Sequence, residues 1–189
     1  LLSKNIYYGT GQLSTVTINR PVQLNGSGGY VGSDSNSNSV MLTGTITGTG
    51  ALMKGLYGTV ILNPTSGANT FSGNVVVANG VLAVQNDAAM GTGSTIEYVV
   101  GNNNGSLKPL TSFSTNRNLL LNGVGIVNTS GQNLTINGQL GTQLTTGSTF
   151  IKVGQGDLIL TGSSSYNGAI QSGALLTNDL SGLQMGGRL

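Results

Sequence analysis

Short apolar runs separated by glycine, asparagine and serine recur along the whole chain. The run Thr15-Val16-Thr17-Ile18 alternates polar and apolar residues, which is the pattern of a β-strand with one buried face. We therefore expect Val16, Ile18 and Ile46 to point inward. Residues 75–77 and 119–121 are apolar throughout, so the pattern does not assign their facing. The intervals between runs are too short for helical crossovers of the βαβ type.

The sequence also repeats itself with a period of about 97 residues, which is a signature of repeat architectures. The same order of strand, lysine, glycine, strand, aromatic-glycine pair and aspartate occurs twice. The paired positions are Arg20 and Arg117, Lys54 and Lys152, Gly58 and Gly156, Phe71 and Tyr166, Gly73 and Gly168, and Asp87 and Asp179. We expect one β-solenoid segment over residues 1–189, with similar units at about 15–100 and 112–187, belonging to a longer protein.

Strands of three to seven residues, joined by tight bends and repeated in fixed order, predict an all-β fold in which successive turns of the chain stack as a parallel β-helix. Glycine and Asn-Gly pairs suit its sharp bends because they tolerate positive φ. Asn-Gly is equally a signal for β-hairpins, so an antiparallel sandwich or barrel is the rival fold. The conserved order of features between the two units favours the solenoid.

One stretch resembles a known family in order and spacing. The residues that carry the likeness are 44–54, Gly58-Thr59-Val60-Ile61-Leu62, Asn69-Thr70-Phe71-Ser72-Gly73, Val75, Gly80-Val81-Leu82 and residues 86–93. They resemble the autotransporter passenger-associated strand repeat, and residues 134–179 resemble it more loosely. The resemblance implies a right-handed parallel β-helix (β-solenoid) at a bacterial cell surface, serving as a stalk and often in adhesion.

Composition narrows the function classes. Only 6% of residues are charged, and 32 of 189 are glycine, yet recurrent Val/Ile/Leu runs argue against disorder. The net charge of +2 comes from scattered residues, so we expect no nucleic-acid partner. No apolar run approaches the roughly 20 residues of a spanning helix, so we expect no membrane insertion of this segment. Absence of cysteine fits an exported protein.

The residues needed for most enzyme chemistry are scarce. The sequence has no histidine and no cysteine, which removes the usual base–nucleophile pairs and zinc sites. A polysaccharide-cleaving β-helix enzyme would need paired carboxylates. The carboxylates are Asp34, Asp87, Glu97, Asp157 and Asp179. We interpret Asp87 and Asp179 as turn caps, Asp34 as a loop residue and Glu97 as an outward charge, and predict no catalytic, cofactor or metal site.

The remaining repeated residues have structural interpretations. We expect Lys54 and Lys152 to be exposed edge charges rather than anion-binding groups, and Phe71 and Tyr166 to stack inside the coil. Two polar loops, at residues 30–39 and 101–106, are candidates for binding glycan or another surface.

The sequence thus favours an extracellular structural stalk or filament, which would self-associate through stacked coils or extend as a longer array. A glycan-binding or cell-surface-binding adhesin module is the alternative. A polysaccharide-active enzyme is a remote third.

Overall fold

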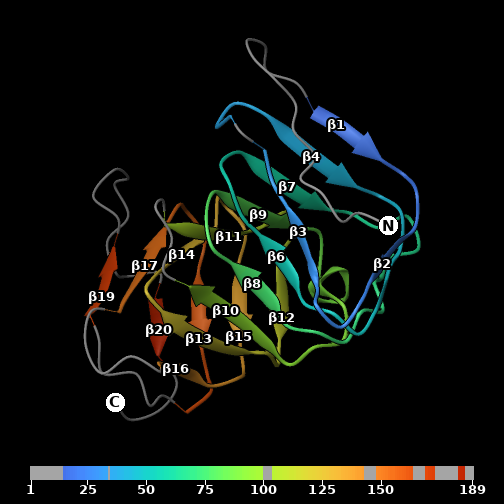
Figure 1. The fold of residues 1–189 in the computed structure, drawn as a ribbon. Coiled ribbons are helices and arrows are strands. Elements are labelled where there is room, and N and C mark those ends of the chain that lie inside the picture. Colours follow the sequence, from blue (N-terminus) through green and yellow to red (C-terminus); the bar gives the residue numbers. More distant parts are fainter. Residues whose placement is uncertain are drawn as a thin grey trace.

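The computed structural model describes residues 15–33, 35–99, 104–142, 148–163, 169–172 and 183–185, with the backbone alone described at 142, 169–172 and 183–185. Within these ranges all strand ladders are parallel, and each strand pairs with the one a full turn away. The chain is a β-solenoid, as the sequence predicted, and not an antiparallel sandwich or barrel. Figure 1 shows the strands stacked in rows along the axis of the coil.

The first face of the coil is an eight-stranded sheet to which every turn contributes one strand. Its strands, in spatial order, are β1 (Thr15–Ile18), β4 (Ser39–Leu42), β7 (Thr59–Leu62), β9 (Val81–Val84), β11 (Gly105–Pro109), β14 (Val124–Asn128), β17 (Thr149–Val153) and β19 (Ala169–Ser172). One register column passes through Val16, Val40, Val60, Leu82, Leu107, Val127, Lys152 and Ser172. One turn therefore takes about 20 to 25 residues.

The other long face is a six-stranded sheet, and the face between the two is divided. The six strands are β3 (Gly29–Val31), β6 (Leu52–Lys54), β8 (Val75–Val77), β10 (Thr95–Val99), β13 (Asn118–Asn122) and β16 (Leu140–Thr142). The middle face has the pair β2 (Val22–Leu24) and β5 (Ile46–Gly48), and the four strands β12 (Phe113–Thr115), β15 (Leu134–Ile136), β18 (Leu158–Leu160) and β20 (Leu183–Met185).

Alternating inward side chains fill the interior of the coil. Ile46, Val60, Leu82, Ile96 and Leu107 are completely buried in one continuous core. Val16 and Ile18 are only partly covered, and Ile18 packs against this core. The structure settles the two runs whose facing the sequence left open. All three residues of 75–77 are buried, whereas in 119–121 the first and third residues are buried and Leu120 is half-buried.

The middle face is interrupted in the third and fourth turns, where the loop after β7 and the short 3-10 helix η1 (Asp87–Met90) replace strands. The buried Asn69 side chain bridges this break. Its Oδ1 accepts from the Ile46 amide at 2.7 Å, and its Nδ2 donates to the Ala89 carbonyl at 2.6 Å. One side chain thus satisfies backbone groups on the turns before and after its own, as a ladder bond would.

Asn69→Leu is expected to lower the free energy of unfolding by about 2 kcal/mol, because it leaves a buried amide and a buried carbonyl without partners. Urea denaturation followed by circular dichroism measures the change. Asn69→Asp keeps the acceptor but loses the donor. Its lower stability should come from the unpaired Ala89 carbonyl and from the buried negative charge. A neutral result for Asn69→Leu would contradict the bridging role.

Candidate functional site

Two short bends between strands share one design, and each contains one of the repeated lysines. We call residues 54–58 and 152–156 the first and second lysine-pinned turns. In each, the lysine ends or nearly ends a strand, and the third and fifth residues have positive φ: Leu56 (55°) and Gly58 (63°) in the first, Gly154 (81°) and Gly156 (92°) in the second. The repeated glycines Gly58 and Gly156 are thus left-handed corner positions, where a side chain would be strained.

In the first lysine-pinned turn, the lysine side chain lies inside the coil. Lys54 is 0% exposed and occupies the inward column between Val31 and Val77. Its Nζ donates to the carbonyls of Gly55 (2.7 Å), Leu56 (3.1 Å) and Tyr57 (3.1 Å), and to Asn79 of the next turn (2.8 Å). One ammonium group therefore satisfies the carbonyls of a sharp bend and ties two turns together.

The second lysine-pinned turn uses two donors. Lys152 is 2% exposed, and its Nζ donates to the Gly154 carbonyl at 2.8 Å. The hydroxyl of Thr129, one turn earlier, lies within 2.7 to 3.3 Å of four carbonyls of residues 153–156, with Gln155 nearest. Thr129 holds the place that Ser33 holds beside the first turn, where the Ser33 amide donates to Tyr57.

These contacts correct the sequence interpretation of both lysines, which expected exposed edge charges. A lysine beside apolar residues is exposed more often than not, but here each one sits at an inward position of its strand. The available signal was the phase of the alternation: Leu52 and Lys54 are two residues apart, so they share a face. Left-handed glycines after the lysine mark the bend whose carbonyls need a donor.

Burial lowers the pKa of Lys54 from its usual value to about 8. The carbonyls around Nζ oppose this shift, because they accept hydrogen bonds from the charged form. Burial acts in the opposite direction on Tyr98, raising the pKa of its phenol, whose Oη donates to the Ile126 carbonyl at 2.9 Å. The two groups therefore give opposite pH dependences.

Stability is expected to rise by about 1–3 kcal/mol between pH 7 and pH 9.5 and to fall above about pH 10. Between pH 8 and 10.5 the unfolded chain binds a proton at Lys54 that the folded chain releases, so raising the pH favours folding. Above about pH 10 the unfolded chain ionises Tyr98 while the folded chain does not, which favours unfolding. Urea midpoints across this range measure the profile, and Lys54→Met should remove its rising part.

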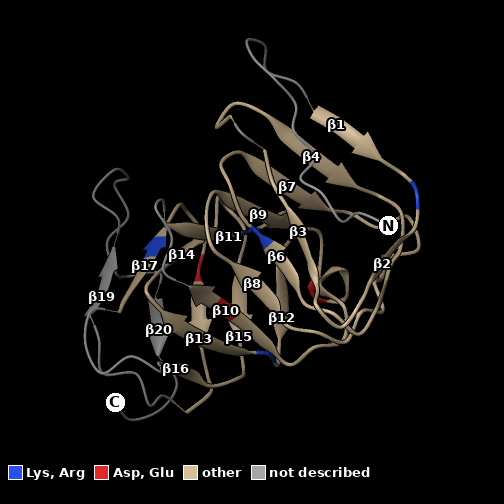
Figure 2. Cartoon of the chain, viewed as in Figure 1, with Lys and Arg blue, Asp and Glu red and all other residues tan. Residues whose placement is uncertain are grey.

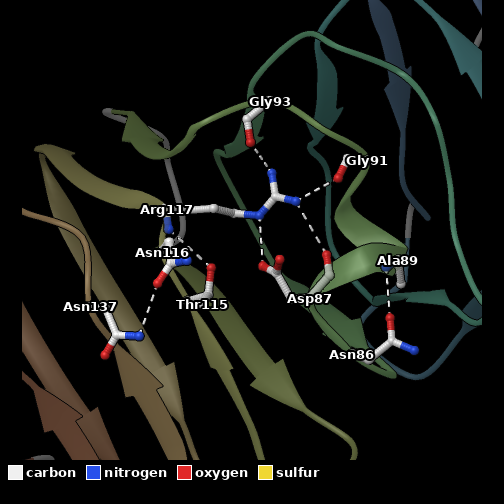
Figure 3. A network of polar contacts seen from close by, with 9 residues as sticks. All are labelled: Asn86, Asp87, Ala89, Gly91, Gly93, Thr115, Asn116, Arg117 and Asn137. Carbon is white, nitrogen blue, oxygen red and sulfur yellow. Dashed lines mark hydrogen bonds and ion pairs between the residues drawn. The ribbon is translucent and has the colours of Figure 1, made fainter.

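A third polar cluster holds η1 against the next turn (Figure 3). The Arg117 guanidinium, 7% exposed, pairs with the Asp87 carboxylate, with 2.8 Å between Nε and Oδ1. Its two terminal nitrogens donate to the carbonyls of Gly91 (2.6 Å), Gly93 and Asp87 (3.3 Å). All three arginine nitrogens are thereby used on one loop, which suits the fixed fork geometry of a guanidinium.

The structure separates residues that the sequence paired here. Arg20 is exposed and precedes a strand of the two-stranded sheet, whereas Arg117 is buried and precedes a strand of the six-stranded sheet. The capping interpretation of Asp87 is wrong as well. Asn86 caps η1 by accepting from the Ala89 amide at 2.8 Å, while the Asp87 carboxylate accepts from Arg117.

Phe71 is completely buried, as expected. Gly73 lies so close to the backbone of residues 50–51 that a Cβ would overlap it. Tyr166, Gly168, Asp179 and Asp34 fall outside the described residues. Within the predicted loops, residues 101–103 and Asp34 also lie outside, and Gly105 and Ser106 belong to β11.

The described carboxylates form no chemical centre. Charged residues are few and scattered along the part of the chain that the structure describes (Figure 2), and the Asp87 carboxylate faces Arg117 rather than another carboxylate. Glu97 is half-buried and accepts from the Asn122 amide at 2.9 Å, so it joins two turns of the coil. No group of three or more possible metal-binding side chains occurs among the described residues. The buried polar side chains therefore pair with backbone amide and carbonyl groups, at the bends of the coil and at the break in its middle face.

Comparison with known proteins agrees with this architecture. The family model for the passenger-associated-transport-repeat matches residues 57–84 and 150–176, which begin within or beside the two lysine-pinned turns. This chain carries two passenger-associated transport repeats. Its fold is a β-solenoid, and the two family matches agree with the resemblance found in the sequence.

A curated relative of the passenger-repeat chain is the "Adhesin BmaC autotransporter" of Brucella suis biovar 1 (strain 1330), 37% identical over 179 residues. The alignment covers 87% of this chain but 5% of that relative's length. No solved structure matches the chain. Within the described residues, no helix has the length and hydrophobicity to cross a membrane. Together the family and the relative imply a cell-surface or secreted protein.

Proposed function

We propose that this passenger-repeat segment is a non-enzymatic stalk of a bacterial surface protein. The observation that carries the proposal is the register column from β1 to β19, which continues through every turn of the eight-stranded sheet. Hydrogen bonds of such a ladder run along the coil axis and space the turns about 4.8 Å apart. The segment thus acts as a stiff spacer whose length is set by its number of turns.

The use of charged and polar side chains supports the same function. Lys54, Lys152 and Arg117 are buried and donate to backbone carbonyls of bends and loops. These groups hold the corners of the coil, where a strand ladder leaves carbonyls without partners. The polysaccharide-cleaving alternative lacks support, because the described residues bring no two carboxylates together around a site.

Removal of one whole turn tests the stalk. Thr149 pairs in register with Val124, so deleting residues 124–148 joins Gly123 to Thr149 and lets β17 take the place of β14. We expect this variant to keep its β-sheet circular dichroism and cooperative unfolding, with its long dimension in small-angle scattering shortened by about 5 Å. Deleting residues 124–136, about half a turn, should abolish cooperative unfolding. Equal loss in both deletions would overturn the stalk proposal.

Surface binding is the second function we propose, since the relative that matches most of this chain is named an adhesin. A surface-binding function also accounts for polar residues placed on exposed corners of a rigid coil. Self-association through stacked turns remains a prediction, which sedimentation velocity at several concentrations tests directly.

A further inference from the structure

Two partly exposed tyrosines lie on neighbouring turns of the solenoid. Among the side chains that the structure describes, the exposed large hydrophobic residues are Tyr30, 39% exposed, and Tyr57, 40% exposed. Tyr30 lies in β3, and Tyr57 lies in the first lysine-pinned turn, one turn of the coil later. Ser33 and Tyr57 form an isolated bridge, which places the two segments side by side.

Gly55 leaves room for the ring of Tyr30 because it has no side chain. A Cβ added at Gly55 would lie 2.1 Å from both Cζ and Oη of Tyr30 and 2.2 Å from its Cε2. The phenol end of Tyr30 therefore occupies the space beside Gly55 that a side chain would fill. Tyr57 follows Gly55 by two residues in the same bend, so its backbone lies close to the Tyr30 ring.

The backbone of this bend is fixed before any partner binds. Lys54 Nζ donates to the carbonyls of Gly55, Leu56 and Tyr57, from beneath the turn. The Ser33 amide donates to the Tyr57 carbonyl from the neighbouring turn. A rigid aromatic surface loses little conformational entropy on binding, which is the advantage of tyrosine in recognition surfaces.

The fold does not require either tyrosine. The second lysine-pinned turn has the same pattern of positive φ and the same buried lysine, yet Gln155 stands where the first turn has Tyr57. Tyr30 also has a counterpart beside the second lysine-pinned turn. Tyr30 pairs in register with Met53, the residue before Lys54. Ile126 pairs in the same way with Ile151, the residue before Lys152, so isoleucine stands there in place of tyrosine. The tyrosines are therefore additions to a turn that forms without them.

We propose that Tyr30 and Tyr57 form a binding surface for a neutral sugar ring of a glycan, a proposal that deepens the surface-binding function and rests on it. Tyrosine rings pack against the apolar face of a ring while the phenol remains hydrogen-bonded at its edge. Ser35, Asn36 and Ser37 follow β3; the Ser35 carbonyl lies close to Gly58 of the first lysine-pinned turn, and Asn36 and Ser37 are exposed. Their hydroxyl and amide groups can pair with sugar hydroxyls.

The size of the surface favours a sugar over a folded protein. Stable protein interfaces bury about 800 Å² on each partner. Two tyrosines that are each less than half exposed offer far less area than that, but they match one or two rings of an oligosaccharide. A second copy of this chain and a protein ligand are therefore outcomes for the test to exclude.

The experiment uses the 189-residue chain on an array of neutral and sialylated glycans, with affinities for any neutral hit measured by calorimetry. Tyr57→Gln copies the second lysine-pinned turn and should weaken binding at least about tenfold with the urea midpoint unchanged. Tyr30→Ala should act similarly, whereas Tyr30→Phe should keep binding within about threefold. Gly55→Ala should also weaken binding, because its Cβ displaces the Tyr30 ring without removing it.

Ser114→Ala, an exposed change on the distant β12, is the matched control and should leave binding unaltered. The proposal is overturned if no neutral glycan binds, if only sialylated glycans bind, or if Tyr57→Gln binds as well as the parent. Concentration-dependent self-association that Tyr57→Gln removes would assign the surface to a second copy instead. If a neutral glycan binds but Tyr57→Gln binds it as well as the parent, the surface-binding function stands and only the tyrosine site fails. Failure of the whole-turn deletion would concern the stalk alone.

Discussion

Arg117→Met is expected to lower the free energy of unfolding by about 2–4 kcal/mol, which would be a large fraction of the stability of an ordinary domain. The substitution removes the donor from the Asp87 carboxylate and from the carbonyls of Asp87, Gly91 and Gly93. The Asp87 side chain is 39% exposed, so water compensates part of its loss. The buried carbonyls account for the remainder.

Arg20→Met is the matched control for this substitution, because the sequence pairs the two arginines while the structure leaves Arg20 exposed. We expect it to change stability by less than about 0.5 kcal/mol. Arg117→Lys should recover less than half of the loss, since one ammonium group lacks the reach of a guanidinium fork. Urea midpoints of the three variants measure the comparison. Equal effects at positions 20 and 117 would contradict the role assigned to Arg117.

Lys54→Met is expected to cost about 2–3 kcal/mol at pH 7 and to reduce glycan binding along with stability. The loss comes from four carbonyls that share one ammonium group, offset in part because a buried charge no longer has to be desolvated. Proteolysis should then open the chain first at residues 55–57, because that bend is the one released.

Lys108→Met serves as the control for Lys54, since Lys108 is half-buried on the outer side of β11. It should change stability by less than about 0.5 kcal/mol and leave residues 55–57 resistant to protease. Mass spectrometry of the first cleavage products identifies the site. Cleavage elsewhere in Lys54→Met would show that the lysine stabilises some other part of the coil.

Much of the architecture is predictable from the sequence because it depends on local alternation and turn chemistry. Short strands with inward Val, Leu and Ile, closed by glycine, leave few alternatives to a solenoid once they recur in order. The corners could not be predicted in the same way. Whether Lys54 faces inward depends on which residues of a three-residue strand point into the coil, and a shift by one residue reverses this.

The polar clusters were less accessible to sequence reasoning because they join residues from different turns. Arg117 reaches Asp87 across 30 positions, and no local pattern marks that pairing. Repetition was misleading at this point, since it equated Arg20 with Arg117 although their strands lie on different faces. Sequence likeness preserved the order of features along the chain but not the direction in which they point.

That difference in direction has a geometric consequence. Lys54 ends a strand of the six-stranded sheet in the second turn, and Lys152 lies in the eight-stranded sheet of the seventh, so the repeats are about four and one-third turns apart. An array that kept this spacing would place its lysine-pinned corners along a spiral that returns to its starting side after three repeats. Groups carried on those corners would then radiate around the rod, so that a partner could meet one from any approach.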